Sequence, residues 1–184
     1  MNKVICVTGP MAAGKNYICS QMELEGWTSI DADLLVHDAI KNKTEEIYST
    51  FKPYADKKSL QLKTEDGQIN RRALGQIVFS DPSLLKKQED IVYPEITRMI
   101  NDFIRENSYK KIIINATVLY KTPELLNKCE YVVYITAPLL TRLKRARKRD
   151  NLPYRQILRR FWAQRNLLKC YKKNIESVIV IKNS

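Results

Sequence analysis

The chain has 184 residues, 44% of them hydrophobic, which is enough to build a buried core and excludes wholesale disorder. Its formal net charge is +12, yet residues 1–141 hold 18 basic and 18 acidic side chains, so the whole surplus lies between Arg142 and Lys182, with 14 basic residues and two acids. No stretch approaches the ~18 consecutive apolar residues of a membrane span, and four scattered cysteines with one histidine fit no zinc-binding spacing.

The beginning of the sequence predicts a cytoplasmic protein. The first apolar run, Val4 to Val7, ends at Gly9 and is too short for the core of a secretory signal peptide. Without such a leader, cysteines that form no CxxC pair are expected to be reduced thiols. At this length a single domain is the expectation.

Strand and helix patterns alternate along the first forty residues. Val4 to Val7 has the continuous apolar character of a strand buried on both faces. The elements expected next are a helix over 15–25, ended by Gly26, a strand over 27–30 and a helix through residue 40.

The middle of the chain is polar and has helical patterns. Helices are expected over 45–51, over 70–79 with Asn70 as the cap, and from the start signal Ser80-Asp81-Pro82 to about Val92. Pro94 should end or kink that last helix because proline has no backbone N–H donor. A further helix then places the apolar residues of 96–104 on one face, which is typical of core packing.

Strands return in the last third of the chain. They are expected over 111–115, 131–136 and 177–181, with a short helix from Pro123 and two basic helices over 138–149 and 153–169. Buried strands that alternate with helices predict an α/β domain around a mainly parallel five-stranded sheet. Ligands of such sheets bind beyond the carboxyl ends of the strands, where this sequence has Gly9, Asp31, Asn115 and Thr136.

Residues 9–16 read Gly-Pro-Met-Ala-Ala-Gly-Lys-Asn, the GxxxxGK pattern of a phosphate-binding loop, between an apolar strand and a helix. Gly9 and Gly14 allow the loop to fold back so that backbone N–H groups converge on a phosphate, and the start of the helix adds its positive end. Lys15 would then reach the β- and γ-phosphates of a nucleotide. The alternative is a plain strand–turn–helix corner with a surface lysine.

Three polar residues near this loop are candidates for metal and proton chemistry. Asn16 stands where the pattern has Ser or Thr, and its amide oxygen can replace the hydroxyl as a Mg²⁺ ligand. Asp31 and Asp33 follow the second strand, expected beside the loop, where a carboxylate can hold magnesium or take the proton of an attacking hydroxyl. Asp33 is the better candidate base. The alternative is that Asp33 only caps the next helix and that Asp31 is a solvated strand end.

These segments resemble the dephospho-coenzyme A kinase family. The resemblance is carried by the loop, by Ile-Asp-Ala-Asp at 30–33, by Asp-Gly-Gln-Ile-Asn-Arg-Arg-Ala-Leu at 66–74 and by Val-Phe-Ser-Asp-Pro at 78–82. Ala137-Pro138, Arg145, Arg149-Asp150, Ala163-Gln164 and Asn183-Ser184 follow in the family's order. The resemblance covers almost the whole chain, and the blocks after the loop are more specific than the loop itself.

The resemblance implies a P-loop fold of three layers, α/β/α, and one kinase domain over 1–184. That domain would comprise a core of 1–34, 111–144 and 170–184, a helical acceptor-binding insertion at about 35–110 and a lid at about 145–160. The implied reaction transfers the γ-phosphate of ATP to the ribose 3′-hydroxyl of dephospho-coenzyme A, with Mg²⁺ as cofactor.

The resemblance also implies roles for single residues. Lys15, Asp33 and Arg149 would be catalytic, Asp31, Asp33, His37 and Arg71 would bind the acceptor, and Asn16 and Asp31 would hold the metal. ATP would be bound by Met11, Ala12, Ala13, Gly14, Lys15, Asn16, Tyr17, Arg145, Arg149, Arg160 and Asn183.

Among the departures from the family pattern, such as Tyr93-Pro94 in place of the family's His-Pro, two lie near the expected magnesium site. Asn16 replaces a hydroxyl, and Asn115 replaces an acid after the third strand, so two positions near magnesium lack a hydroxyl or a charge. An ATP-binding relative with impaired catalysis, or a kinase of another nucleoside-like acceptor, is therefore an alternative.

The basic last quarter fits a closing lid, because arginines can neutralise charge that moves off the γ-phosphate. Arg149 and Arg160 are the first candidates and Arg145 the next. A nucleic-acid surface beside Phe161 and Trp162 is a second alternative, which the family resemblance disfavours, and the remaining charges are expected to be solvated. The expected partners are small-molecule substrates and no membrane, and the oligomeric state is not predicted.

Overall fold

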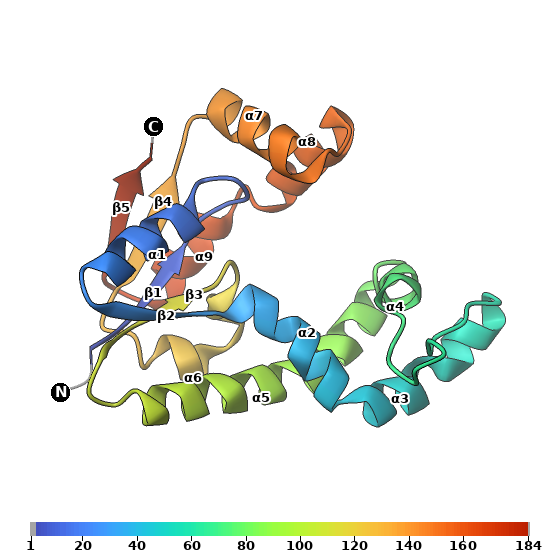
Figure 1. Cartoon of the computed structure of the whole chain (residues 1–184). Coiled ribbons are helices and arrows are strands. Elements are labelled where there is room, and N and C mark those ends of the chain that lie inside the picture. The colour runs from blue at the N-terminus through green and yellow to red at the C-terminus, as the bar shows by residue number, and fades with distance from the viewer. Residues whose placement is uncertain (1–2, 184) are drawn as a thin grey trace. The chain divides into compact units, whose positions relative to one another are not determined.

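The computed structural model describes residues 3–183. Within them five strands form one sheet: β1 (Val4–Thr8), β2 (Trp27–Asp31), β3 (Lys111–Asn115), β4 (Val132–Thr136) and β5 (Val178–Lys182). Their spatial order is β2-β3-β1-β4-β5, and every neighbouring pair is parallel (Figure 1). The predicted α/β fold with a parallel five-stranded sheet is confirmed.

Helices connect these strands. They are α1 (Lys15–Leu24), α2 (Ala32–Asn42), α3 (Thr44–Lys57), α4 (Arg71–Val78), α5 (Pro82–Glu106), the 3₁₀ turn η1 (Leu119–Lys121), α6 (Pro123–Leu126), α7 (Leu139–Asp150), α8 (Tyr154–Ala163) and α9 (Leu167–Asn174). In the described part of the chain no helix combines the length and the apolar character that crossing a bilayer requires.

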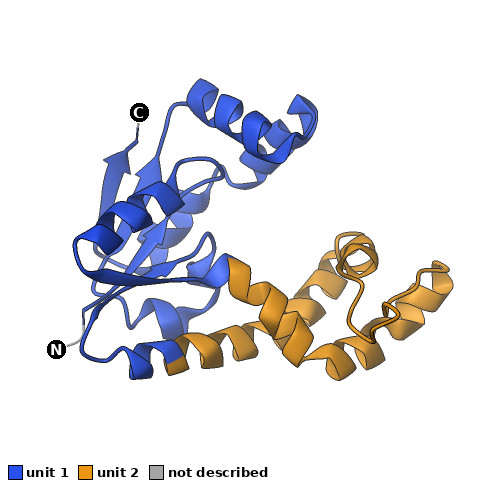
Figure 2. Cartoon of the chain, viewed as in Figure 1, with its two compact units in different colours: residues 1–33, 103–184 blue, residues 34–102 orange. Residues whose placement is uncertain are grey.

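The chain divides into two compact units (Figure 2). Unit 1 comprises residues 1–33 and 103–184 and contains the whole sheet, and unit 2 comprises residues 34–102. The chain passes from one unit to the other within α2 and again within α5. In sequence, unit 2 is therefore an insertion between β2 and β3.

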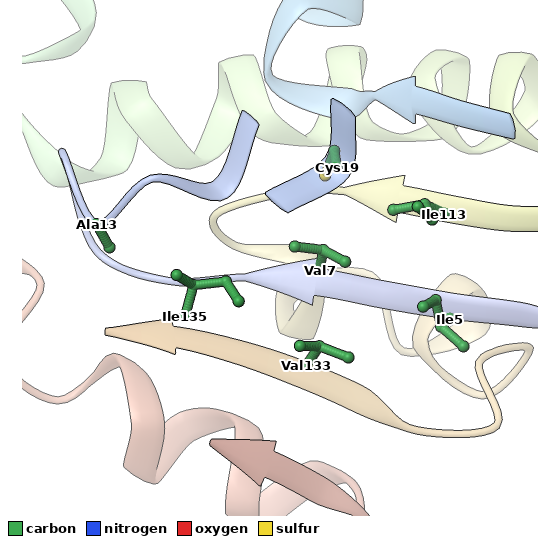
Figure 3. Packing of buried hydrophobic residues seen from close by; sticks show 7 residues of the cluster. All are labelled: Ile5, Val7, Ala13, Cys19, Ile113, Val133 and Ile135. Carbon is green, nitrogen blue, oxygen red and sulfur yellow. The ribbon is translucent and has the colours of Figure 1, made fainter. Parts of the chain in front are cut away.

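The core of unit 1 lies on both faces of the central strand β1, which is buried along its whole length. One face carries the cluster Ile5, Val7, Ala13, Cys19, Ile113, Val133 and Ile135 (Figure 3). Cys19 brings α1 onto that face. Successive side chains of a strand point to opposite faces, and on the other face Thr8 of β1 and Tyr171 of α9 donate hydrogen bonds to the same carbonyl oxygen, that of Thr117. Helices thus cover both faces and give three layers.

The core of unit 2 includes the contact between α3 and α4. Ile47 and Phe51 on α3 and Leu74 and Ile77 on α4 are fully buried. Asn70 caps α4 as the sequence predicts, because its side-chain oxygen accepts a hydrogen bond of 3.2 Å from the N–H of Ala73. The cap orients the helix start that carries Arg71.

Pro94 does not interrupt α5, which runs from Pro82 to Glu106 with the proline inside it. The predicted end near Val92 is therefore wrong. A proline inside a helix costs about 3 kcal/mol, but Val92, Ile96 and Ile100 are buried on the same helix. Each buried side chain of this size contributes about 1.5–3 kcal/mol, so their sum exceeds the cost of the proline.

The second basic helix, predicted over 153–169, is in fact two helices, because α8 ends at Ala163 and α9 begins at Leu167. The turn between them lets both Phe161 on α8 and Tyr171 on α9 be buried. Neither Gly nor Pro marks this turn, so the sequence carries no stop signal there.

β3 lies between β1 and β2, so the strand before Asp31 does not pair with the strand before the loop, although Asp31 still lies near the loop, to which Asn115 connects it. Asn115 of β3 is in register with Val7 of β1 and with Asp31 of β2. The chain leaves the sheet after β2 and returns after unit 2 to fill the gap between the two strands, an order that chain sequence alone leaves open.

Candidate active site

Glycines give the loop after β1, residues 9–16, its shape. Gly9 and Gly14 have φ angles of 154° and 98°. A Cβ at Gly9 would collide with the backbone carbonyl oxygen of Ile135, and a Cβ at Gly14 would collide with the side-chain amide of Asn183. Gly9 therefore lets the end of β1 approach β4, and Gly14 lets the loop turn into α1 through a left-handed cap.

Ala12 is a strained residue of the same loop. Its φ is 61°, in the left-handed region that a residue with a Cβ enters at a cost of about 1–2 kcal/mol. The N–H of Ala13 donates to the carbonyl of Pro10 at 3.1 Å and closes the turn around it. The surrounding bonds thus hold a backbone conformation that alanine alone does not prefer.

Lys15 folds back over the loop. Its Nζ donates to the carbonyl oxygen of Gly9 at 3.2 Å. Burial lowers the pKa of Lys15, and the nearby carboxylates of Asp33 and Asp31 act in the opposite direction. The site therefore holds a partly dehydrated cation, which an anionic ligand would stabilise.

A hollow of about 240 Å³ opens over the loop. It is lined by Ala12, Ala13, Gly14, Lys15, Asn16, Tyr17, Arg145 and Arg149, all of which belong to the set predicted to bind ATP. Because α1 begins at Lys15, the N–H groups of its first turn have no partner within the helix. These donors, the lysine and the two arginines together suit a multiply charged anion.

The arginines of α7 and α8 differ in their partners. Nη1 of Arg145 is buried and has no hydrogen-bond partner among residues 3–183. Arg149 donates to Asp150 through Nε at 2.7 Å and through Nη2 at 3.1 Å, and this bonding raises the pKa of Arg149. Arg160 is exposed on α8 and is not among the residues that line the hollow. Nη2 of Arg142 is also buried without a partner in the described part of the chain, but of these two arginines only Arg145 lines the hollow, so its Nη1 is the donor that can reach a ligand there.

Met11 and Asn183 support the loop and do not line the hollow. The side chain of Met11 is buried in the cluster between α7 and α8, and its N–H donates to Oε1 of Gln164 at 2.7 Å. Nδ2 of Asn183, just after β5, donates to the carbonyl oxygen of Ala13 at 2.9 Å. Both residues therefore fix the backbone that surrounds the hollow.

Asn115, at the end of β3, connects the loop to Asp31, the acid at the end of β2. Its Nδ2 donates to Oδ1 of Asn16 and to Oδ2 of Asp31, each at 3.0 Å. The side chain is only 4% exposed, and its Oδ1 has no hydrogen-bond partner in the described part of the chain. The two residues predicted to hold a metal are thus brought together by one buried amide.

Asp33 is oriented by Thr117. The N–H of Thr117 donates to Oδ1 of Asp33 at 3.2 Å, and its Oγ1 donates to Oδ2 at 2.6 Å. The capping role that was the alternative for Asp33 belongs to Asp31, whose Oδ1 accepts a hydrogen bond of 2.9 Å from the N–H of Asp33. Each carboxylate oxygen of the exposed Asp33 retains a lone pair for a further proton donor.

In unit 2, the two predicted acceptor-binding residues share one hollow. His37 on α2 and Arg71 at the start of α4 line a space of about 230 Å³. The other residues that line it are Asp38, Ile40, Lys41, Gln68 and Ile69. Lys41 and Arg71 give this hollow two cationic side chains.

The groups that support Asp33 were not among the predicted site residues. The hydroxyl of Tyr171 accepts a hydrogen bond from the N–H of Leu119 at 2.9 Å and donates to the carbonyl of Thr117 at 3.2 Å. Oγ1 of Thr8 donates to the same carbonyl at 3.2 Å. Burial raises the pKa of Tyr171, so its proton stays in place. The position of Thr117, two residues beyond a strand end, was the one available signal.

Several known proteins resemble this chain over most of its length. A family model described as dephospho-CoA kinase matches residues 3–184. Dephospho-CoA kinase from Treponema denticola is 36% identical over 184 residues, which cover 98% of this chain and 82% of that protein. The enzyme of the same name from Treponema pallidum is 35% identical over 165 residues, covering 88% and 78%.

Two solved structures are similar over the whole chain. The structure of TT1252 from Thermus thermophilus has a TM-score of 0.82 at 26% identity and is covered over 89% of its length. Dephospho-CoA kinase from Campylobacter jejuni has a TM-score of 0.70 at 25% identity and is covered over 90%.

Proposed function

The chain belongs to the dephospho-CoA kinase family, and from this we infer that it transfers the γ-phosphate of ATP to the ribose 3′-hydroxyl of dephospho-coenzyme A, giving ADP and coenzyme A. One observation carries the inference beyond the family match. At one edge of the sheet, Nδ2 of Asn115 joins Asn16, the residue after Lys15, to Asp31. Thr117, just beyond the same strand, donates two hydrogen bonds to Asp33. A phosphate-binding cation and a candidate base therefore share one site.

On the donor side, the hollow over the loop would hold the phosphates of ATP. The N–H groups of the first turn of α1 would donate to the phosphate oxygens, and Lys15 would move from the carbonyl of Gly9 to the β- and γ-phosphates. Arg145, whose Nη1 has no partner within residues 3–183, would donate to the transferring group together with Arg149. Such preformed donors favour the transition state because they need little rearrangement.

On the acceptor side, Asp33 would receive the proton of the attacking hydroxyl. The hydroxyl oxygen forms a bond to the γ-phosphorus while the bond from that phosphorus to the β–γ bridging oxygen breaks, and ADP leaves with the electron pair. The two hydrogen bonds from Thr117 keep the carboxylate of Asp33 in one orientation for this transfer.

The hollow in unit 2 is proposed to bind a phosphate group of the acceptor. Dephospho-coenzyme A carries a diphosphate, and the guanidinium of Arg71 and the ammonium of Lys41 line this hollow beside His37. Arginine suits such a group because its planar fork donates two hydrogen bonds at once.

The residues at the loop fit Mg²⁺ as a partner of the nucleotide. The described residues hold no group of three or more His, Cys, Asp or Glu that could bind a metal ion by itself, without a bound nucleotide. Mg²⁺ in phosphoryl-transfer sites is commonly held by one or two protein oxygens together with phosphates and water. Asp31 would supply one of these oxygens. Asn16 would supply a second one after the hydrogen bond between its side-chain oxygen and Asn115 breaks. The ion would neutralise charge on the phosphates.

We place this reaction in the cytoplasm. Cys6, Cys19, Cys129 and Cys170 are free thiols, as proteins of a reducing compartment commonly have. The substrates would be the two small molecules ATP and dephospho-coenzyme A.

A coupled ADP-release assay tests the function. Purified protein is supplied with ATP and Mg²⁺ and then with dephospho-coenzyme A, adenosine or another nucleoside. We expect ADP to form with dephospho-coenzyme A far faster than with the nucleosides. Equal rates with adenosine would assign a different acceptor, and ATP binding without ADP release from any acceptor would identify an impaired relative.

A further inference from the structure

Gln164 connects the end of α8 to the loop of residues 9–16. Its backbone N–H bonds to the carbonyls of Arg160 and Phe161 at 3.3 and 3.1 Å, so the residue is fixed to the helix as its C-cap. Its side-chain oxygen Oε1 accepts a hydrogen bond of 2.7 Å from the N–H of Met11. One residue therefore joins two segments of unit 1 that are 153 positions apart in the sequence.

Met11 is held at its carbonyl as well. Nε of Arg142 on α7 donates to the carbonyl oxygen of Met11 at 2.9 Å, and the guanidinium carbon lies 4.1 Å from the ring centroid of Phe161 on α8. The side chain of Met11 is buried with Phe161, Ala146 and Ile157. The peptide groups on both sides of Met11 are therefore attached to the pair formed by α7 and α8.

The next residue makes this attachment relevant to the nucleotide. Ala12 lines the hollow over the loop and has the strained φ of 61°. A strained conformation persists only where its surroundings fix it, and the peptide that links Met11 to Ala12 is fixed by Arg142. The hydrogen bond from the N–H of Met11 to Gln164 is a second attachment, which keeps this segment from rotating.

We propose that Gln164 is a positioning residue for ATP. By accepting the N–H of Met11, it holds the phosphate loop against α8, so that the loop and the α7–α8 pair, which carries Arg145 and Arg149, bind the nucleotide as one body. The proposal rests on the proposed function only in taking ATP as the nucleotide.

A helix cap alone would not need this side chain, because the capping bonds of Gln164 come from its backbone N–H. The loss of its side-chain acceptor would leave the Met11 N–H unpaired and several loop donors less well aligned. We expect ATP to bind about tenfold more weakly, which corresponds to about 1.4 kcal/mol.

Binding of ATP, measured by calorimetry without any acceptor, tests the proposal. Gln164→Met removes the acceptor at similar size, and Gln164→Glu keeps an oxygen at the same reach. The Met variant should bind ATP about tenfold more weakly and the Glu variant within about twofold of the original chain. Gln156→Met, at an exposed glutamine of the same helix, is the matched control and should bind normally.

Equal affinity in the original chain and the Met variant would overturn the proposal, as would a Glu variant that binds as weakly as the Met variant. Should the Met variant fail to fold, Gln164→Asn replaces it, because its oxygen is one methylene short of Met11. The Asn variant should then be weak and the Glu variant near normal, and equal binding by these two would again contradict the proposal.

A fluorescence measurement tests the joint movement. Trp162, on α8 two residues before Gln164, is 67% exposed, and in a Trp27→Phe background it is the single tryptophan. Saturating ATP should change its emission, and Gln164→Met should reduce that change at saturation. An undiminished change would refute coupling through Gln164. These measurements contain ATP and no acceptor, so their result stands even if the ADP-release assay with dephospho-coenzyme A fails. If the proposal for Gln164 fails instead, the result of the ADP-release assay still stands.

Discussion

The side-chain amides of Asn16 and Asn115 are hydrogen-bonded to each other, from Nδ2 of Asn115 to Oδ1 of Asn16 at 3.0 Å. The same Nδ2 also donates to Oδ2 of Asp31, so one neutral group satisfies two oxygens at the point where a metal-bound nucleotide would lie. This arrangement keeps Asp31 paired in the absence of any cation.

Asn115→Asp should make the fold sensitive to magnesium. The new carboxylate would be buried and would lie about 3 Å from that of Asp31, and two such like charges destabilise one another. We expect a loss of about 1–3 kcal/mol in the presence of a chelator and a partial recovery with Mg²⁺. Thermal melting with and without the ion measures this, with the original chain as the control. A variant that melts identically in both buffers would contradict the role given to Asn115.

Lys15→Ala should slow ADP formation strongly without lowering stability. Burial already lowers the pKa of Lys15, which means that the folded protein disfavours this charge in the absence of a ligand. We expect turnover to fall by at least about 10²-fold and the melting temperature to stay constant or rise. Lys144→Ala, at an exposed position of α7, should change neither quantity. Retained turnover would remove Lys15 from the reaction.

Ala12→Gly should stabilise the protein. Glycine relieves the strain of the left-handed φ but gives the unfolded chain more freedom, which leaves a net gain of about 0.5–1 kcal/mol. Urea denaturation measures the free energy of unfolding. Ala163→Gly, at the last residue of α8, should lower it, because a helical position has no such strain to relieve. A loss of stability with Ala12→Gly would show that the strain is not present in solution.

Tyr171→Phe should weaken both the fold and catalysis. It leaves the buried N–H of Leu119 without its acceptor and the carbonyl of Thr117 without one donor, at a cost of about 1–3 kcal/mol. Because Thr117 orients Asp33, kcat should fall while the Kd for ATP stays constant. Chemical denaturation and steady-state kinetics measure the two effects. Tyr109→Phe, at a tyrosine that is 80% exposed, should leave both unchanged.

Glu95 should make stability depend on pH in the acidic range. Hydrogen bonds from Arg98 and Asn42 lower its pKa from 4.5 to about 2. A lowered carboxyl pKa stabilises the folded state above the unfolded value, and this contribution is lost as pH falls from about 4.5 to about 2. In urea titrations across this window Glu95→Gln should flatten the pH dependence, whereas Glu106→Gln, at an exposed residue of α5, should preserve it. Parallel curves for the original chain and Glu95→Gln would contradict the assignment.

Most of the fold could be predicted from the sequence because its signals are local. The apolar runs that became β1 and β3 and the Asn70 cap of α4 depend only on neighbouring residues. The turn after α8 could not be predicted, because burial of Phe161 and Tyr171 decides it and no breaker residue marks it. The helix end predicted before Pro94 was wrong for a related reason, because tertiary packing of α5 offsets the local cost of the proline.

In the candidate site, too, local motifs could be predicted and long-range contacts could not. The residues of the loop that line the hollow stand together in the sequence, so their motif predicts them as a group. Asn115, Thr117 and Gln164 are instead defined by contacts over 84 to 153 positions. Such contacts depend on the order of the strands and on the residue at which α8 ends. Neither of these could be predicted from the pattern of neighbouring residues.

The order of strands in the sheet affects how the chain folds while the ribosome synthesises it. β1 and β2 are made first, yet each is bonded to β3 and not to the other, and the second neighbour of β1 is β4. A ribosome must therefore deliver all of unit 2, residues 34–102, before either strand meets its first partner. Throughout that interval the apolar segment Val4–Thr8 has no strand to pair with, and an unpaired apolar strand is prone to aggregation.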